Sequence, residues 1–130
     1  MQLSDIKFGE VIATTLYSDF ASAAANGVAN EKYNKRTQLR RFYDELVMWH
    51  DKVFHERDEA KRTALFKELE PYIQMLNAKV AYAKGRDHVD DNFAKLFSHC
   101  IKQVNSPLTL KQCKLFFEAF MCYYRTLNNK

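Results

Sequence analysis

The chain has 130 residues, of which 47% are hydrophobic and 14% aromatic, and its formal net charge is +4. This composition excludes an intrinsically disordered chain, and the length fits a single domain over residues 1–130 that buries its own core. Three Gly and two Pro residues are too few turn formers for an all-β domain, and no apolar run approaches the ~20 residues of a membrane span.

The first part of the chain contains one candidate helix. Residues 1–7 are expected to be frayed or ordered by a partner, because chain ends have few contacts. Residues 8–25 can form a helix, which Gly27 is expected to end after an Ala-rich stretch, and residues 26–34 are then a loop. The apolar spacing predicts that the buried face of this helix carries Val11, Ile12, Leu16 and Phe20.

The most clearly amphipathic segment is the central helix expected over Lys35–Phe54, which should end near His55. Either Asn34 or Thr37 can cap its start. Trp49 lies off the apolar stripe, and we expect it to pack against the core rather than to mark a protein contact. The stripe itself, with three- and four-residue steps, consists of Leu39, Phe42, Tyr43, Leu46, His50, Val53 and Phe54.

A third helical stretch is predicted from residue 59 to residue 85, with Asp58 as its cap. Pro71 lies inside this stretch. A proline removes one backbone donor and clashes with the preceding turn, so we expect a kink or a break there, or a new helix that starts at Pro71. Gly85 is expected to end the stretch in the left-handed conformation that glycine adopts at helix ends.

Two more helices complete the predicted fold. Three acids between Asp87 and Asp91 precede the first of them, where the helix dipole favours negative charge. Pro107 marks the next break, and Thr109 with Gln112 matches a capping box for the last helix. Five amphipathic helices with short connections predict an all-α fold, a single-domain bundle of about five helices.

The sequence lacks the spacings of common catalytic sites. It has neither a phosphate-binding glycine loop nor a nucleophile elbow. Some small all-α ribonucleases place a His four to six residues after an Arg, and no Arg here is followed in that way. Asp90 and Asp91 could ligate a metal, but adjacent acids at a helix start are more often caps. We therefore expect a protein that is not an enzyme.

The cysteines and histidines give no sign of a metal or a cofactor. Cys100, Cys113 and Cys122 are odd in number and form no CxxC motif, so we expect reduced thiols in core positions. The four histidines have neither HExxH nor ExxH spacing. The first ten residues lack the basic cap and apolar core of a signal peptide. A reducing, cytoplasmic location and no bound cofactor or metal are therefore expected.

Cations are concentrated in two blocks without acids, residues 32–41 and residues 79–86. If the helices pack antiparallel, the start of the central helix lies near the end of the third, and the blocks merge into one surface for RNA phosphates. If the protein neutralises ~4 phosphates of a single strand, log K for binding falls with log salt at a slope of roughly −3, and the affinity is weak. Several copies or a larger assembly would then be needed for useful binding. The candidate RNA-binding residues are Lys35, Arg36, Arg40, Arg41, Lys79, Lys84 and Arg86.

Tyrosines are interleaved with these cations. They can stack on bases or sugars, or form the edge of the core. They are Tyr33, Tyr43 and Tyr82. Arg40 has an alternative as well, because it lies four residues before Asp44 and can form an intrahelical ion pair.

Three motifs together resemble a known family. RTQLRRFYDEL at Arg36–Leu46 and LNAKVAYAKGR at Leu76–Arg86, followed by FFEAFMCYYR ending at Arg125, are similar to the small helical subunit of the type III-A CRISPR interference complex, the Csm complex. The resemblance is strongest over residues 32–126. It implies a non-catalytic bundle for antiviral defence, which contacts guide RNA and target RNA, stacks on copies of itself and binds other subunits. It also implies that the cations of the first two motifs contact RNA.

Two other functions remain open on the residues alone. A helical adaptor or scaffold would bind protein partners through exposed aromatic side chains without direct RNA binding. An all-α enzyme would need catalytic residues that the sequence does not display. The resemblance favours the first interpretation, a structural RNA-binding subunit, and contacts to the RNA backbone rather than to base edges would let such a subunit accept any guide sequence.

Overall fold

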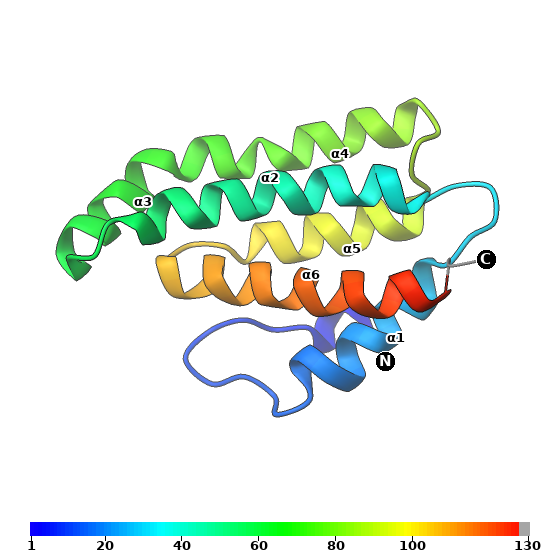
Figure 1. Cartoon of the computed structure of the whole chain (residues 1–130), viewed down its shortest axis with the longest axis horizontal. Helices are drawn as coiled ribbons and strands as arrows, with labels where there is room; N and C mark the ends of the chain where they lie inside the picture. The colour runs from blue at the N-terminus through cyan, green and yellow to red at the C-terminus, as the bar shows by residue number, and fades with distance from the viewer. Residues whose placement is uncertain (128–130) are drawn as a thin grey trace.

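Helices account for all the regular structure in residues 1–127, the part of the chain that the computed structural model describes. Within this part there is no β-strand, and none of the helices is both long and apolar enough to cross a membrane. The predicted all-α bundle is confirmed (Figure 1). Its helices are α1 (Ala21–Val28), α2 (Arg36–His55), α3 (Glu59–Gln74), α4 (Leu76–Gly85), α5 (Asp91–Lys102) and α6 (Pro107–Leu127).

The core is built mainly from aromatic side chains of α5 and α6. Their ring centroids lie 5.2–5.5 Å apart for Phe97–Phe117, Phe117–Phe120 and Phe120–Tyr124. The three- and four-residue spacing of these positions places them on one face of α6, against which α1 and α2 pack. Burying one such ring contributes roughly 1.5–3 kcal/mol. The buried aromatic residues are Phe66, Phe93, Phe97, Phe116, Phe117, Phe120 and Tyr124.

Helix α2 runs from Arg36 to His55, as predicted. Neither of the expected caps is used. The N-cap position is Lys35, without a side-chain cap, and Thr37 is already inside the first turn. Asn34 is completely buried, with a left-handed φ of 58°, and its side chain bonds to Val28 and Asp90 instead. Tertiary hydrogen bonds therefore compete successfully with local capping.

The prediction of a helix over residues 8–25 is wrong for residues 8–15 and confirmed for residues 16–25. Helical turns begin only at Leu16, with one π-helical segment over Leu16–Phe20, and α1 follows. The backbone N–H groups of Phe8 and Gly9 donate to the side-chain oxygens of Gln103 and Gln112, at 3.0 and 2.8 Å. These long-range bonds hold the segment in a non-helical conformation. Val11, expected on the buried face, is 90% exposed.

The first residues and the end of α1 also differ from simple expectation. A short 3₁₀ turn spans Leu3–Asp5, and Ile6 is fully buried, with its carbonyl accepting a hydrogen bond from Gln103 Nε2. Gly27 lies inside α1, which ends one residue later. Residues 1–9 are therefore attached to α5 and α6 by both apolar burial and hydrogen bonds.

The third predicted stretch is divided into α3 and α4. Asp58 caps α3 as predicted, because its carboxylate accepts from the Lys61 N–H at 2.9 Å. The helix continues through Pro71, and the interruption falls four residues later, at Met75. The two helices follow one another antiparallel to α2 (Figure 1). Gly85 has no left-handed conformation; Asp87 takes it, with φ 59°.

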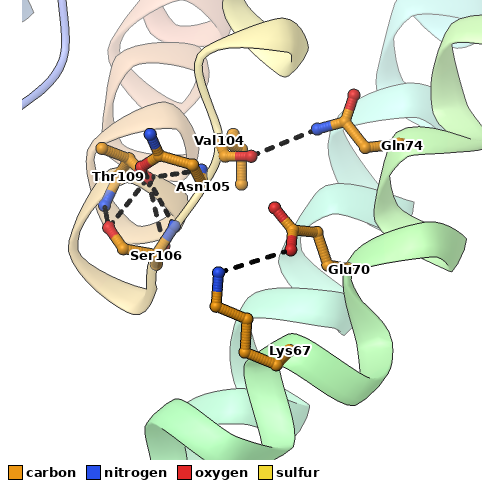
Figure 2. Close-up of polar contacts among 7 residues, drawn as sticks. All are labelled: Lys67, Glu70, Gln74, Val104, Asn105, Ser106 and Thr109. Atoms are coloured by element: carbon orange, nitrogen blue, oxygen red, sulfur yellow. Dashed lines mark hydrogen bonds and ion pairs between the residues drawn. The ribbon is translucent and has the colours of Figure 1, made fainter.

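The side chain of Gln74 ties the end of α3 to the end of α5. Its amide nitrogen donates to the carbonyl of Ile101 at 2.8 Å. It also donates to the carbonyl of Val104 at 3.2 Å (Figure 2). The last carbonyls of a helix have no intrahelical partner, so this amide satisfies groups that would otherwise depend on solvent. The contact fixes the helix interruption at Met75 against the α5–α6 connection.

The start of α6 is capped by Ser106, and the predicted Thr109–Gln112 capping box is wrong. The Ser106 hydroxyl oxygen accepts from the Thr109 N–H at 3.1 Å, and the Thr109 hydroxyl oxygen accepts from the Ser106 N–H at 3.0 Å (Figure 2). Pro107 is the first helical residue, where its missing donor has no cost. Gln112 bonds both backbone groups of Gly9 instead.

Candidate nucleic-acid interface

The two basic blocks lie at the same end of the bundle. Helix α2 begins where α4 ends, and the N–H of Asn34 donates to the carbonyl of His88 at 3.2 Å, which holds the two connections together (Figure 1). Farther along, Lys79 of α4 forms an ion pair with Glu45 of α2 at 2.8 Å. The antiparallel arrangement that we expected therefore brings residues 32–41 and 79–86 to one end.

Both lysines of the α4 block are held in ion pairs. Lys79 contacts Glu45, and Lys84 contacts Asp91 at 2.7 Å. Asp91 also pairs with Lys95 at 2.8 Å. The hydrogen bonds from Lys84 and Lys95 lower the pKa of Asp91 to about 2, so this carboxylate stays ionised at physiological pH. The positive charge of this block is largely compensated within the chain.

Arg86 is the exception in the α4 block. Its guanidinium lies over the ring of Tyr82, 5.9 Å from the centroid, and donates to the Tyr82 hydroxyl at 3.2 Å. No carboxylate within residues 1–127 lies in ion-pair distance of it. Tyr82 is 66% exposed, so its other ring face is open to solvent. An exposed ring beside an arginine can stack on a base.

The arginines of the α2 block differ in their partners. Arg40 pairs with Asp44 at 3.2 Å, and both side chains are well exposed, so the intrahelical alternative is confirmed. Arg36 and Arg41 have no carboxylate within 4 Å in the described part of the chain. Lys35 Nζ donates to the carbonyl of Glu31 at 2.7 Å, which is a neutral acceptor. Lys35, Arg36 and Arg41 therefore keep an uncompensated charge.

The block is also split between two sides of α2. Arg41 lies one turn before Glu45, whose carboxylate reaches α4, so Arg41 is on the α4 side. Arg36 and Arg40 are on the α6 side, where they line a hollow between α2 and α6 of about 300 Å³. The hollow is lined by Arg36, Arg40, Tyr43, Glu118, Met121, Cys122 and Arg125.

Arg125 is a residue of this hollow that the sequence did not identify as a site residue. It lies in the last turn of α6, and no carboxylate in residues 1–127 pairs with it. Glu118, the acid of the hollow, is paired with Lys114 at 2.7 Å. Partial burial, followed by the nearby Glu118, raises the pKa of Tyr43, which therefore keeps its phenolic proton. Only the packing of α6 on α2 brings Arg125 to the basic block.

A second hollow of about 680 Å³ adjoins the first and shares Arg36 with it. It lies between the start of α2 and the end of α6. The first turn of α2 contains no acid, and its N-cap has no side-chain cap. The surface is therefore concave and positive over both hollows. The second one is lined by Ala29, Asn30, Glu31, Lys35, Arg36, Thr37 and Leu127.

Other candidate residues have structural positions. Trp49 is half-buried against the core and stacks on Tyr72 at 6.2 Å, so the expected packing is confirmed. Asp90 caps α5 by accepting from the Phe93 N–H at 3.0 Å. Cys100 and Cys113 are buried, and burial raises the pKa of both thiols, whereas Cys122 is exposed and so departs from the expected core position.

Comparison with known proteins identifies the family. No curated protein and no solved structure matches the sequence. A family model described as Csm2 Type III-A matches residues 14–130. This range is nearly the whole chain and includes the three motifs noted in the sequence. The helical bundle and the family match agree with each other. The chain belongs to the Csm2 family, the structural subunits of the type III-A CRISPR complex.

Proposed function

We propose that this protein is a non-catalytic, cytoplasmic subunit that binds RNA within the type III-A CRISPR effector. It contacts the guide RNA and its target through the basic end of the bundle, and it stacks on further copies of itself and on other subunits in antiviral defence. The arginine and lysine side chains contact phosphates and not base edges, because a subunit that must accept any guide sequence cannot depend on base identity. The cations concerned are Lys35, Arg36, Arg40, Arg41, Lys79, Lys84 and Arg86.

The observation that carries this proposal is the excess of unpaired cations at one end. Arg36, Arg41 and Arg86 come from the start of α2 and from the turn after α4, and no carboxylate in the described residues neutralises them. A cluster of uncompensated arginines favours a polyanion, because binding releases the counterions condensed on it.

The cations that form ion pairs within the chain are expected to contribute less to RNA binding than the unpaired arginines. Exposed ion pairs such as Arg40–Asp44 contribute only about 0–1 kcal/mol, so their cations can exchange a carboxylate for a phosphate. Lys79 must release Glu45, which is half-buried, and is therefore the less available lysine. We rank Arg36, Arg41 and Arg86 above Lys79 and Lys84 as RNA contacts.

Replacing Arg36 and Arg41 together by Ala tests the proposal. If each contacts one phosphate of a single strand, the slope of log K against log salt becomes shallower by about 1.4. The measurement is fluorescence anisotropy with labelled RNAs of several unrelated sequences, which should all weaken alike. The control replaces Lys61 and Lys67 of α3 by Ala, which removes the same charge far from the basic end. An unchanged slope in the arginine variant would refute the assignment.

An adaptor without RNA contact is the second candidate. It is favoured by exposed apolar side chains beside the stacked Trp49–Tyr72 pair, namely Met48 and Met75. Such an adaptor would capture the other effector subunits equally well before and after ribonuclease treatment. The RNA-binding function predicts that ribonuclease lowers the recovery of those subunits.

A further inference from the structure

We propose that the hollow between α2 and α6 is a seat for one nucleotide of the RNA strand, and that Arg125 is a phosphate contact. We call this hollow the α2/α6 groove; it is lined by Arg36, Arg40, Tyr43, Glu118, Met121, Cys122 and Arg125. The inference rests on the proposed RNA binding and adds a location to it. The part of the strand that this groove holds follows the α6 side of α2, and the compensated lysines of α4 contribute less to binding than the arginines.

The charges around the groove favour an anionic ligand. Three arginines and one acid, Glu118, line this space of about 300 Å³. One of the three, Arg40, is paired with Asp44 outside the lining. Lys114 already holds the Glu118 carboxylate at 2.7 Å. Arg36 and Arg125 have no carboxylate partner in residues 1–127, so their mutual repulsion is relieved only by a ligand or by solvent ions. Guanidinium forks match the oxygens of a phosphodiester with two parallel hydrogen bonds.

The rest of the wall fits a nucleoside better than a simple ion. Met121 and the half-buried ring of Tyr43 form an apolar side of the groove. A sugar or a base can pack there without a specific hydrogen bond, which suits a site that accepts any sequence. The Tyr43 hydroxyl keeps its proton and can donate to a phosphate or ribose oxygen.

The groove continues in the direction that a strand would take. The second hollow meets it at Arg36 and extends past Lys35 and Thr37 along the start of α2. A neighbouring phosphate would therefore reach Lys35. Glu45 faces α4, where it binds Lys79, so the other side of α2 carries a compensated pair. Because the two sides of α2 differ in this way, variants on each side can test the groove assignment separately from the proposed RNA-binding function.

The first experiment compares Arg125→Ala with Arg125→Lys in the full chain, by anisotropy with a labelled uridine homopolymer. At 0.1 M salt, loss of one phosphate contact lowers affinity about fivefold through counterion release and makes the salt slope shallower by about 0.7. Arg125→Lys keeps the charge and should keep most of the slope. Lys111→Ala, on the same helix but outside the groove, should bind as the unmodified chain does.

The double variant Lys79→Ala, Lys84→Ala separates this inference from the proposed function. If Arg125→Ala weakens binding and the α4 double variant has a smaller effect, the groove assignment holds. If the α4 double variant weakens binding and Arg125→Ala does not, the groove assignment is overturned and RNA binding stands. If neither variant nor the Arg36, Arg41 double variant changes affinity, both fail.

Cys122 provides a second readout. It lines the groove and is the exposed thiol of the chain, whereas Cys100 and Cys113 are buried. Saturating uridine homopolymer should slow the alkylation of Cys122 at least severalfold, and Arg125→Ala should need an about fivefold higher homopolymer concentration for the same protection. Equal protection by polyglutamate at the same salt would overturn the inference in favour of an acidic peptide. Absence of protection by RNA would overturn it as well.

Discussion

Asn34 is the residue on which the position of the α2 start depends, and its replacement by Ala is our most detailed prediction. Its side-chain nitrogen donates to the Val28 carbonyl at 2.9 Å and to the Asp90 carboxylate at 2.8 Å. Its side-chain oxygen accepts from the Asp90 N–H at 2.8 Å. Its backbone carbonyl accepts from the Tyr124 hydroxyl. The side-chain amide and the backbone carbonyl of Asn34 thus connect α1, α5 and α6 to the start of α2.

The magnitude follows from two terms. Three buried side-chain hydrogen bonds contribute about 1 kcal/mol each, and Asn34 is fully buried, so water does not replace them. Alanine at a left-handed φ of 58° costs roughly another 1 kcal/mol, whereas asparagine tolerates that conformation. We therefore expect Asn34→Ala to lower the free energy of unfolding by about 4 kcal/mol. Asn34→Gly, which avoids the φ term, should be about 1 kcal/mol more stable than Asn34→Ala.

Urea denaturation followed by far-ultraviolet circular dichroism measures both variants, with an unchanged m-value as the condition for comparing them. Asn26→Ala is the control, because Asn26 is exposed and its side chain makes one hydrogen bond, to the Ser22 carbonyl at 2.9 Å. A loss below about 1 kcal/mol for Asn34→Ala would refute the reasoning. It would mean that solvent or a local shift satisfies the groups that Asn34 leaves behind.

Two further predictions concern stability. For Asp91, whose folded pKa of about 2 lies below its usual 3.8, the stabilisation is present above pH 3.8 and is lost as pH falls towards 2. The stability difference between the unmodified chain and Asp91→Asn in urea titrations should therefore shrink over that window, and a constant difference would contradict the Lys84 and Lys95 pairing. Pro71→Ala restores a backbone donor inside α3 and should raise the free energy of unfolding by about 1–3 kcal/mol in the same assay; a loss of stability would show that the proline conformation is needed.

Long periodic segments were predictable because their information is local. The stripe from Leu39 to Val53 repeats with the helical period, and α2 has the predicted length to within a residue or two. The cap at Asp58 followed from its position before a helical stretch. Predictions failed where distant side chains supplied the partners. Gln103 and Gln112 lie about a hundred residues from the backbone groups of Phe8 and Gly9 that they bind.

In the candidate site, too, features set by the local sequence were predictable and features set by distant residues were not. Counting charges in the sequence was enough to find the basic blocks, and their helical placement predicted that they share an end of the bundle. The sequence did not show that α4 lysines are compensated by Glu45 and Asp91, since those acids belong to other helices. Nor did it show Arg125 as a neighbour of Arg36, since the two are far apart in the chain.

The amino-acid order alone thus determined which segments are helices, which face of each is apolar and where positive charge accumulates, because each of these depends on neighbours within a few turns. Tertiary packing decided which of those charges remain unpaired and which hollow they surround. The physical reason is that an ion pair or a groove needs two elements at a defined distance, and only the packing of α6 and α4 against α2 fixes that distance.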